Sequence, residues 1–351
     1  MRSIVSLAEE ACRSAPEPLG LIYDFVHTFR REVAEETIRA RIYEAVEEGR
    51  VVRVCRGVYF ARDGPAQLLM VEGDAWEVMA SLSGDSIGAI VTDPPGKFGR
   101  EWAGKGTTKP HSKLGGRMYR QPELDLEFMR QAFRILKKRT EWNTLSSVRR
   151  AVGVFPEGGA ACLIRVPLEN RTTRRHVQKL ISLAESVGFV YYGEIVVALD
   201  KLGMGYDSGR DKGAKWLLFH AGERNGTLWD YSLPNVIQAR RVRNPCSPTA
   251  TKHEAEKDPS EFTRLIQAVT REGDIVLDPF AGRARWTQQV LAKGRHVILA
   301  DVDGSWFGRV AVDLSTPDHH DQTLGVVTLN RQPEGHNPIH HNDKEPEGRH
   351  T

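Results

Sequence analysis

Hydrophobic residues change their spacing along the chain, and each spacing predicts a different kind of element. Apolar side chains at Ile38, Ile42 and Val46 recur every fourth residue, as on one face of an amphipathic helix. Gly49 is a typical helix stop. Two short apolar runs at residues 51–55 and 58–61 then predict two strands joined by a tight turn.

The N-terminal pattern is a helix followed by a small β-ribbon with basic residues at its tip, and it resembles a winged helix-turn-helix. We expect such a unit over residues 1–65. Units of this kind place a helix in the major groove and the wing on the DNA backbone. They also serve as packing or dimerisation units, and the fold alone does not decide between these roles.

From Gln67 onward, short apolar runs alternate with segments of helical spacing. Runs such as "IGAIVTD" and "HVILADVD" predict buried strands, and "RRHVQKLISLAESVGF" predicts an amphipathic helix. This alternation predicts an α/β domain with a doubly wound, mainly parallel sheet over residues 66–315. In residues 316–351, six of the twelve histidines lie among Pro, Asn, Gly and charged residues. That composition predicts a disordered polar tail, with metal binding as the alternative.

Composition narrows the class of protein. No segment of the 351 residues approaches the roughly 20 apolar residues of a membrane span. The apolar stretch at the N-terminus carries two acids, which is unlike a secretion signal. The four cysteines lie far apart without paired spacing, which argues against a disulfide framework and a zinc site. We expect a cytoplasmic protein without a membrane partner or a metal.

The net charge of +3 is too small to indicate a binding partner, but the distribution of the basic residues along the chain is informative about one. Seven basic residues and one acid lie between Lys97 and Arg120, in a glycine-rich stretch without periodicity. Further arginines occur at residues 171–175 and 240–243. A single cluster of this kind is ordinary surface, whereas three beside candidate site segments favour a polyanionic partner.

Two predicted strands end in an acid and a proline. "VTDPPG" places Asp93 before Pro94 and Pro95, and "VLDPFAG" places Asp278 before Phe280 and Gly282. In open α/β sheets, ligands bind beyond the carboxyl ends of the strands. About 20 residues after Gly282, Asp301 ends another strand, where a ribose-binding acid sits in nucleotide-binding sheets. The pattern predicts a nucleoside-containing cofactor.

The order of these motifs resembles that of site-specific DNA amino-methyltransferases, N6-adenine or N4-cytosine, in which the catalytic motif precedes the cofactor motif. The resemblance runs from about residue 68 to residue 314. It rests on "EGDAWEVMASLSGDSIGAIVTDPPG", "GRDKGAKWLLFHAGERNGTLWDYSLPNVIQARRV", "HEAEKDPSEFTRLIQAVTREGDIVLDPFAG" and "GRHVILADVDGSWFGRV".

The resemblance implies S-adenosyl-L-methionine as cofactor and a flipped base of double-stranded DNA as substrate. It implies that Asp93 and the Pro94 carbonyl accept the two protons of the base's amino group. It also implies roles at the cofactor for a set of residues: Asp74 at the adenine, Asp301 at the ribose, and Asp278, Phe280, Gly282 and Lys257 towards the methionine end. A partner restriction nuclease is a further implication, and the oligomeric state stays open.

The chain departs from the family pattern at three places. Gly96 stands where an aromatic residue normally stacks on the flipped base, and Phe98 is the candidate substitute. Arg283, Ala284 and Arg285 replace a run of small residues; Ala284 is then either strained or crowds the cofactor, or an arginine binds the cofactor carboxylate. The segment "HEAEKDP" matches its family counterpart only in part.

Two functions therefore compete. The first is methyl transfer to adenine N6, favoured over cytosine N4 because Asp-Pro-Pro goes mostly with adenine within the family. The second is a catalytically degenerate DNA-binding protein that keeps the fold. Methylation of RNA or of a protein amide is a third possibility, and Asp93 counts against it because Asn-Pro-Pro is the form expected there.

Overall fold

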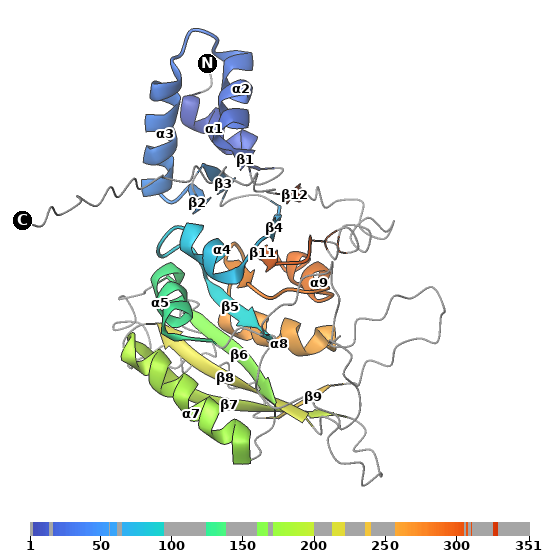
Figure 1. Cartoon of the computed structure of the whole chain (residues 1–351). Coiled ribbons are helices and arrows are strands. Elements are labelled where there is room, and N and C mark those ends of the chain that lie inside the picture. The colour runs from blue at the N-terminus through green and yellow to red at the C-terminus, as the bar shows by residue number, and fades with distance from the viewer. Residues whose placement is uncertain are drawn as a thin grey trace, which may run out of the picture.

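The computed structural model describes thirteen parts of the chain (Figure 1). They are residues 3–13, 17–55, 57–61, 65–94, 124–137, 160–167, 171–199, 213–221, 236–239, 257–304, 307, 310 and 326–328. No helix within these ranges is long and apolar enough to cross a membrane.

The N-terminal unit packs three helices on a small antiparallel sheet (Figure 1). Its strands pair in the order β1-β3-β2. The expected helix and both expected strands are present, and two further helices and a short strand precede them. The elements are α1 (Ile4–Ala11), β1 (Glu17–Pro18), α2 (Leu19–Phe29), α3 (Glu35–Glu47), β2 (Val51–Cys55) and β3 (Val58–Ala61).

Helix α3 forms where the apolar spacing predicts it. Ile38, Ile42 and Ala45 are buried in the core of the N-terminal unit, while two acids occupy the first helical turn. Beyond the helix, Gly49 has a φ of 71°, in the left-handed region that glycine adopts at little cost. That this unit is a winged helix-turn-helix remains a prediction.

A nine-stranded sheet forms the larger part of the protein, in the order β12-β4-β11-β10-β5-β6-β8-β7-β9. Strand β8 is antiparallel to both neighbours, and the other neighbouring pairs are parallel. The strands are β4 (Leu68–Glu72), β5 (Ala89–Thr92), β6 (Ala161–Pro167), β7 (Phe189–Leu199), β8 (Gly213–Ala221), β9 (Val236–Ala239), β10 (Ile275–Asp278), β11 (His296–Asp301) and β12 (Val326–Thr328).

Helices cover both faces of this sheet. Helices α4 (Ala75–Ser81), α5 (Leu126–Ile135) and α7 (Arg171–Ser186) contribute to one core cluster, and α8 (Pro259–Val269) and α9 (Thr287–Leu291) contribute to the other. Along β5 the side chains alternate, with Ile90 in the first cluster and Ala89 and Val91 in the second. The predicted doubly wound, mainly parallel α/β fold is confirmed.

Strand β12 pairs with β4 inside the segment expected to be a polar tail, and neither β12 nor β9 is predicted by the hydrophobic pattern. Residues 329–351, with the tail histidines from His336 onward, lie outside the described residues.

The two units are joined by packing as well as by the chain. The Phe60 ring of β3 is buried in the larger core and stacks on His296, with ring centroids 5.3 Å apart. The Gln67 N–H donates to His296 Nδ1 at 3.1 Å, and the Gln67 side chain donates to the Cys12 carbonyl in the N-terminal unit. The N-terminal unit is therefore fixed to the amino-terminal end of β11.

Candidate active site

Four neighbouring strands of the sheet end at one edge, and each is followed or terminated by an aspartate. In sheet order these are Asp74 after β4, Asp301 at the end of β11, Asp278 at the end of β10 and Asp93 after β5. All four are residues that the sequence predicts for the site. Because parallel strands bring their carboxyl ends together, this edge is where an open α/β sheet binds ligands.

Asp278 is the most buried of these carboxylates. Its Oδ1 accepts hydrogen bonds from the Thr92 hydroxyl at 2.8 Å and from the Phe280 N–H at 3.1 Å. Burial raises the pKa of Asp278 from 3.8 to about 7; the two hydrogen bonds oppose the rise, and the charges of Asp93 and Asp301 add to it. A cationic ligand beside this carboxyl would stabilise its ionised form, which burial and the neighbouring carboxylates disfavour.

Asp301 ties the loop after β10 to the end of β11. Its Oδ2 accepts from the Gly282 N–H at 2.8 Å, and its Oδ1 accepts from the Asp303 N–H at 2.9 Å. Gly282 has a φ of 52°, which a glycine tolerates and which lets the backbone turn towards Asp301. The predicted contact of Asp301 with a ribose is compatible with this position and remains a prediction.

Ala284 has a φ of 38°, so the expected strain at this departure from the family pattern is present. For a residue with a side chain this left-handed conformation costs about 1–2 kcal/mol. The Ala284 methyl group is buried in the core cluster that α8 and α9 share. Packing of that methyl group offsets part of the strain.

Asp74 occupies the N-cap of α4. Its Oδ1 accepts from the Trp76 N–H at 2.9 Å and from the Glu77 N–H at 3.4 Å, which stabilises the helix start. The Asp74 side chain is exposed, so the cap leaves it accessible from solvent.

An aromatic cluster joins α4, α5 and the loop that follows β10. Phe280 stacks on Phe128 with centroids 5.9 Å apart, and the Trp76 ring meets both of them edge-on. The Trp76 indole N–H donates to Asp125 at 3.0 Å. Phe280 is predicted for the site from its motif, whereas Trp76 and Phe128 are not, because nothing in the sequence shows that α4 and α5 meet there.

Asp93 lies between two cations. Its Oδ2 is 3.1 Å from Lys257 Nζ, and its Oδ1 is 3.8 Å from Arg165 Nη1. Lys257 is predicted for the cofactor side of the site, and the structure places it on Asp93. No sequence motif predicts Arg165 for the site, although a charged residue inside the apolar strand "ACLIRVP" indicates a buried partner.

Arg165 is held in turn by Glu261 in the first turn of α8. Arg165 Nε donates to Glu261 Oε1 at 2.8 Å, and the Trp216 indole N–H donates to the same oxygen at 2.6 Å. Both Trp216 and Glu261 are buried. Asp93 is thus connected to a polar network of Arg165, Glu261 and Trp216, which no sequence motif predicts.

Pro94 is buried directly after Asp93, whereas Pro95, Gly96 and Phe98 lie outside the described residues. The basic segment from Lys97 to Arg120 lies outside them as well. Within the described ranges, no group of three or more His, Cys, Asp or Glu side chains is arranged to hold a metal ion.

Comparison with known proteins gives a family match for part of the chain. The DNA methylase family N6_N4_Mtase matches residues 174–306, a segment that includes the motifs at Asp278 and Asp301 and excludes Asp93. This match confirms the resemblance to DNA amino-methyltransferases. Among curated proteins, none matches the chain.

Solved structures with similar folds include the cytosine-N4-specific PvuII DNA methyltransferase, with 15% sequence identity and a TM-score of 0.49, over 72% of this chain and 90% of that one. Another is the M1.HpyAVI complex with SAM, with 16% identity and a TM-score of 0.44, over 71% and 100% of the two chains. A third is a Thermus thermophilus protein described as a DNA modification methylase, in complex with S-adenosyl-L-methionine. It has 17% identity and a TM-score of 0.43, over 76% and 100% of the two chains.

The raised pKa of Asp278 predicts a pH-dependent stability. The unfolded chain loses this proton near pH 3.8 and the folded protein keeps it to about pH 7, so folding takes up a proton in that window. The stability that Asp278 contributes therefore falls as the pH rises through the window. Asp278→Asn keeps an oxygen for Thr92 and Phe280 but has no such proton. Relative to wild type, its free energy of unfolding should rise by up to about 1.4 kcal/mol per pH unit between about pH 4.5 and 7.

Urea titrations across this pH range measure the difference between the two proteins. Thr28→Ala, on an exposed face of α2, changes no carboxyl group and serves as the control, since its difference from wild type should not vary with pH. A difference for Asp278→Asn that is equally constant would show that Asp278 is already ionised in the folded protein.

Proposed function

We propose that this protein transfers a methyl group from S-adenosyl-L-methionine to an exocyclic amino group of a DNA base, with adenine N6 as the favoured target. The observation that carries the proposal is the placement of Asp93, followed by Pro94, beside the buried Asp278 at one edge of the sheet. The motif order and the DNA methylase match over residues 174–306 support it.

The residues present fit this cofactor. Asp278 is buried beside two further carboxylates, an arrangement that a sulfonium and an ammonium group would neutralise. Gly282 brings the backbone of the β10 loop close to Asp301, and Asp74 is exposed at the neighbouring strand end. We assign Asp278, Phe280 and Gly282 to the methionine end, Asp301 to the ribose and Asp74 to the adenine. Bound there, the cofactor supplies an electrophilic methyl group.

Asp93 is proposed to activate the exocyclic amino nitrogen of the target base. The lone pair of an exocyclic amino nitrogen is delocalised into the base, so the nitrogen is a poor nucleophile. A carboxylate and the Pro94 carbonyl can accept its two N–H groups and draw the nitrogen towards tetrahedral geometry. Two consecutive prolines restrict the backbone that presents these acceptors. The gain comes from positioning and electrostatics, and the base has to leave the duplex to reach Asp93.

The second candidate is a DNA-binding protein that has lost methyl transfer. Gly96 in place of an aromatic residue, and the strained Ala284 in the cofactor loop, are the observations that favour it.

For the enzyme, we propose that Phe98 supplies the ring that is missing at Gly96. Isothermal titration with S-adenosyl-L-methionine separates the candidates, because absence of binding at millimolar cofactor rules out the enzyme.

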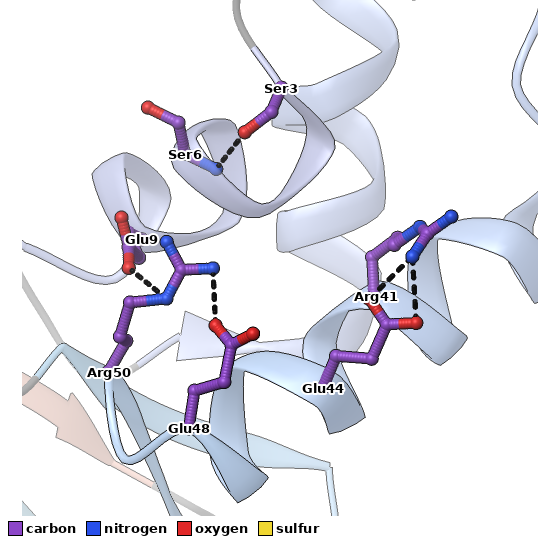
Figure 2. A network of polar contacts seen from close by, with 7 residues as sticks. All are labelled: Ser3, Ser6, Glu9, Arg41, Glu44, Glu48 and Arg50. Atoms are coloured by element: carbon purple, nitrogen blue, oxygen red, sulfur yellow. Dashed lines mark hydrogen bonds and ion pairs between the residues drawn. The ribbon is translucent and has the colours of Figure 1, made fainter.

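DNA binding is assigned to the methyltransferase domain, because α3 of the N-terminal unit presents an acidic surface. Its exposed positions carry four glutamates and two arginines, and both arginines have partners. Arg41 Nη1 lies 2.7 and 2.6 Å from the two carboxylate oxygens of Glu44 (Figure 2). Arg39 donates to the Tyr23 hydroxyl at 2.9 Å. A helix that reads DNA needs basic groups available for phosphates.

The turn after α3 is neutralised in the same way. Arg50 Nη2 is 2.8 Å from Glu48, and its Nε is 3.3 Å from Glu9 of α1 (Figure 2). We therefore propose that α3 and this turn pack the N-terminal unit together and that the basic segment between Lys97 and Arg120 binds the phosphates.

We also propose a cytoplasmic location, which the widely spaced cysteines favour because a reducing compartment keeps them unpaired. A partner restriction nuclease is proposed on the family resemblance alone.

Replacing Asp93 tests the assigned chemistry. In Asp93→Ala, the rate of methyl transfer to DNA should fall at least about 100-fold, because the acceptor for the target amino group is lost. The dissociation constant for S-adenosyl-L-methionine should stay within about twofold of wild type, since Asp93 is not assigned to the cofactor. Transfer of a radioactive methyl group and isothermal titration measure the two quantities. Asp24→Ala, an exposed carboxylate on α2, is the control. A wild-type transfer rate in Asp93→Ala would refute the assignment.

The salt dependence of DNA binding tests where the phosphates bind. Replacing Lys105, Lys109 and Lys113 by Gln should reduce the slope of log K against log salt by up to about 0.9 for each lysine that pairs with a phosphate. The matched control, Arg39→Gln with Arg41→Gln, should leave the slope unchanged because these arginines already have partners in α2 and α3. The reverse pattern would assign DNA binding to α3.

A further inference from the structure

We propose that Arg165 is a positioning residue for the Asp93 carboxylate and that buried Glu261 sets the orientation of Arg165. This inference rests on the proposed function, in which Asp93 receives the target amino group. It adds two residues that neither the sequence motifs nor the family resemblance assigns to the reaction.

The contacts form one chain from the core to the site. Trp216 Nε1 donates to Glu261 Oε1 at 2.6 Å, Arg165 Nε donates to the same oxygen at 2.8 Å, and Arg165 Nη1 lies 3.8 Å from Asp93 Oδ1. Exposure rises along it, since the side chains of Glu261, Arg165 and Asp93 are 1%, 11% and 28% exposed. The chain therefore starts at a fixed point in the core and ends at the group that meets the substrate.

A buried ion pair in this position is a poor way to stabilise a fold. Removing a carboxylate and a guanidinium from water costs free energy, and apolar side chains of similar volume often stabilise a core as well or better. The guanidinium, however, is planar and presents its N–H donors in a rigid fork. With Nε fixed on Glu261, the plane of the group determines where Nη1 lies, and it lies 3.8 Å from Asp93 Oδ1, at ion-pair distance. The pair with Glu261 therefore fixes the orientation of the Arg165 guanidinium relative to Asp93.

The start of α8 controls both oxygens of Asp93. Lys257, just before the helix, contacts Oδ2 at 3.1 Å, and Glu261, in the first turn, acts on Oδ1 through Arg165. The short segment between them is itself fixed, because Asp258 caps the helix by accepting from the Ser260 N–H at 3.0 Å. An ammonium group 3.1 Å from one oxygen and a guanidinium 3.8 Å from the other together favour one orientation of the carboxylate plane. A target amino group that must meet this carboxylate in a single geometry loses rate when the plane turns.

The test uses a variant that removes the pair without leaving a buried charge. In Arg165→Met with Glu261→Gln, the glutamine oxygen can still accept from Trp216, so the protein should fold. We expect kcat for methyl transfer to fall between tenfold and a hundredfold, while KM for DNA and for S-adenosyl-L-methionine stays within about twofold. Lys137→Met with Asp274→Asn is the matched control. It removes another buried pair, 3.1 Å apart, at the amino-terminal end of β10, and it should leave kcat within twofold.

A second measurement is independent of activity. Crystal structures of the wild type and of the Arg165→Met/Glu261→Gln variant should show Asp93 in one orientation in the first and turned away or in several orientations in the second. An unchanged Asp93 in the variant overturns the proposal, as does a kcat within twofold of wild type. If the wild type itself transfers no methyl group to DNA, the proposed function fails, and the orientation of Asp93 still decides whether Arg165 and Glu261 position it.

Discussion

Four neighbouring strands of the sheet end in an aspartate or are followed by one, and the charges of Asp93 and Asp301 act on the buried Asp278 between them. Each aspartate is accommodated differently. Asp74 caps α4, Asp301 accepts two backbone N–H groups, and Asp93 contacts Lys257 and Arg165. Asp278 is buried, and the neighbouring charges help to keep its proton on. Asp278 also accepts two hydrogen bonds, but its ionised form is clearly disfavoured, because burial raises its pKa to about 7.

This difference divides the site into two halves. Around Asp278 a cationic ligand is favoured, in keeping with the proposal that a sulfonium cofactor binds at the loop that follows β10. Around Asp93 the cations come from the protein itself, through β6 and the start of α8. The Thr92 hydroxyl links the halves, because it precedes Asp93 in the chain and donates to Asp278. A methyl donor on one side and an amino acceptor on the other would meet between neighbouring strand ends.

The sequence predicts the parts of this site that are local in the chain. Strands that end in Asp-Pro are visible from a few residues, and so are the glycine turn at Gly282 and the strain at Ala284, where a glycine is missing. The network behind Asp93 is not local. Arg165, Trp216 and Glu261 are separated by 45 residues or more, and they meet only because β6 pairs with β8 and α8 packs on the same face. The order of strands in the sheet, which no motif specifies, creates that meeting. In the N-terminal unit, the helical periodicity predicts α3 correctly. The pairing of Arg41 with Glu44 on its surface depends on side-chain conformation, which the periodicity does not predict.

The most direct test of the account is the nucleoside composition of DNA from host cells that express the protein. DNA from cells with the wild-type protein, digested to nucleosides and analysed by mass spectrometry, should contain N6-methyladenine above the level of cells without it, and cells that express Asp93→Ala should not. N4-methylcytosine in its place would keep the mechanism and correct the target base. Neither modified base in cells that contain the folded protein would contradict methyl transfer and favour a DNA-binding protein that keeps only the fold.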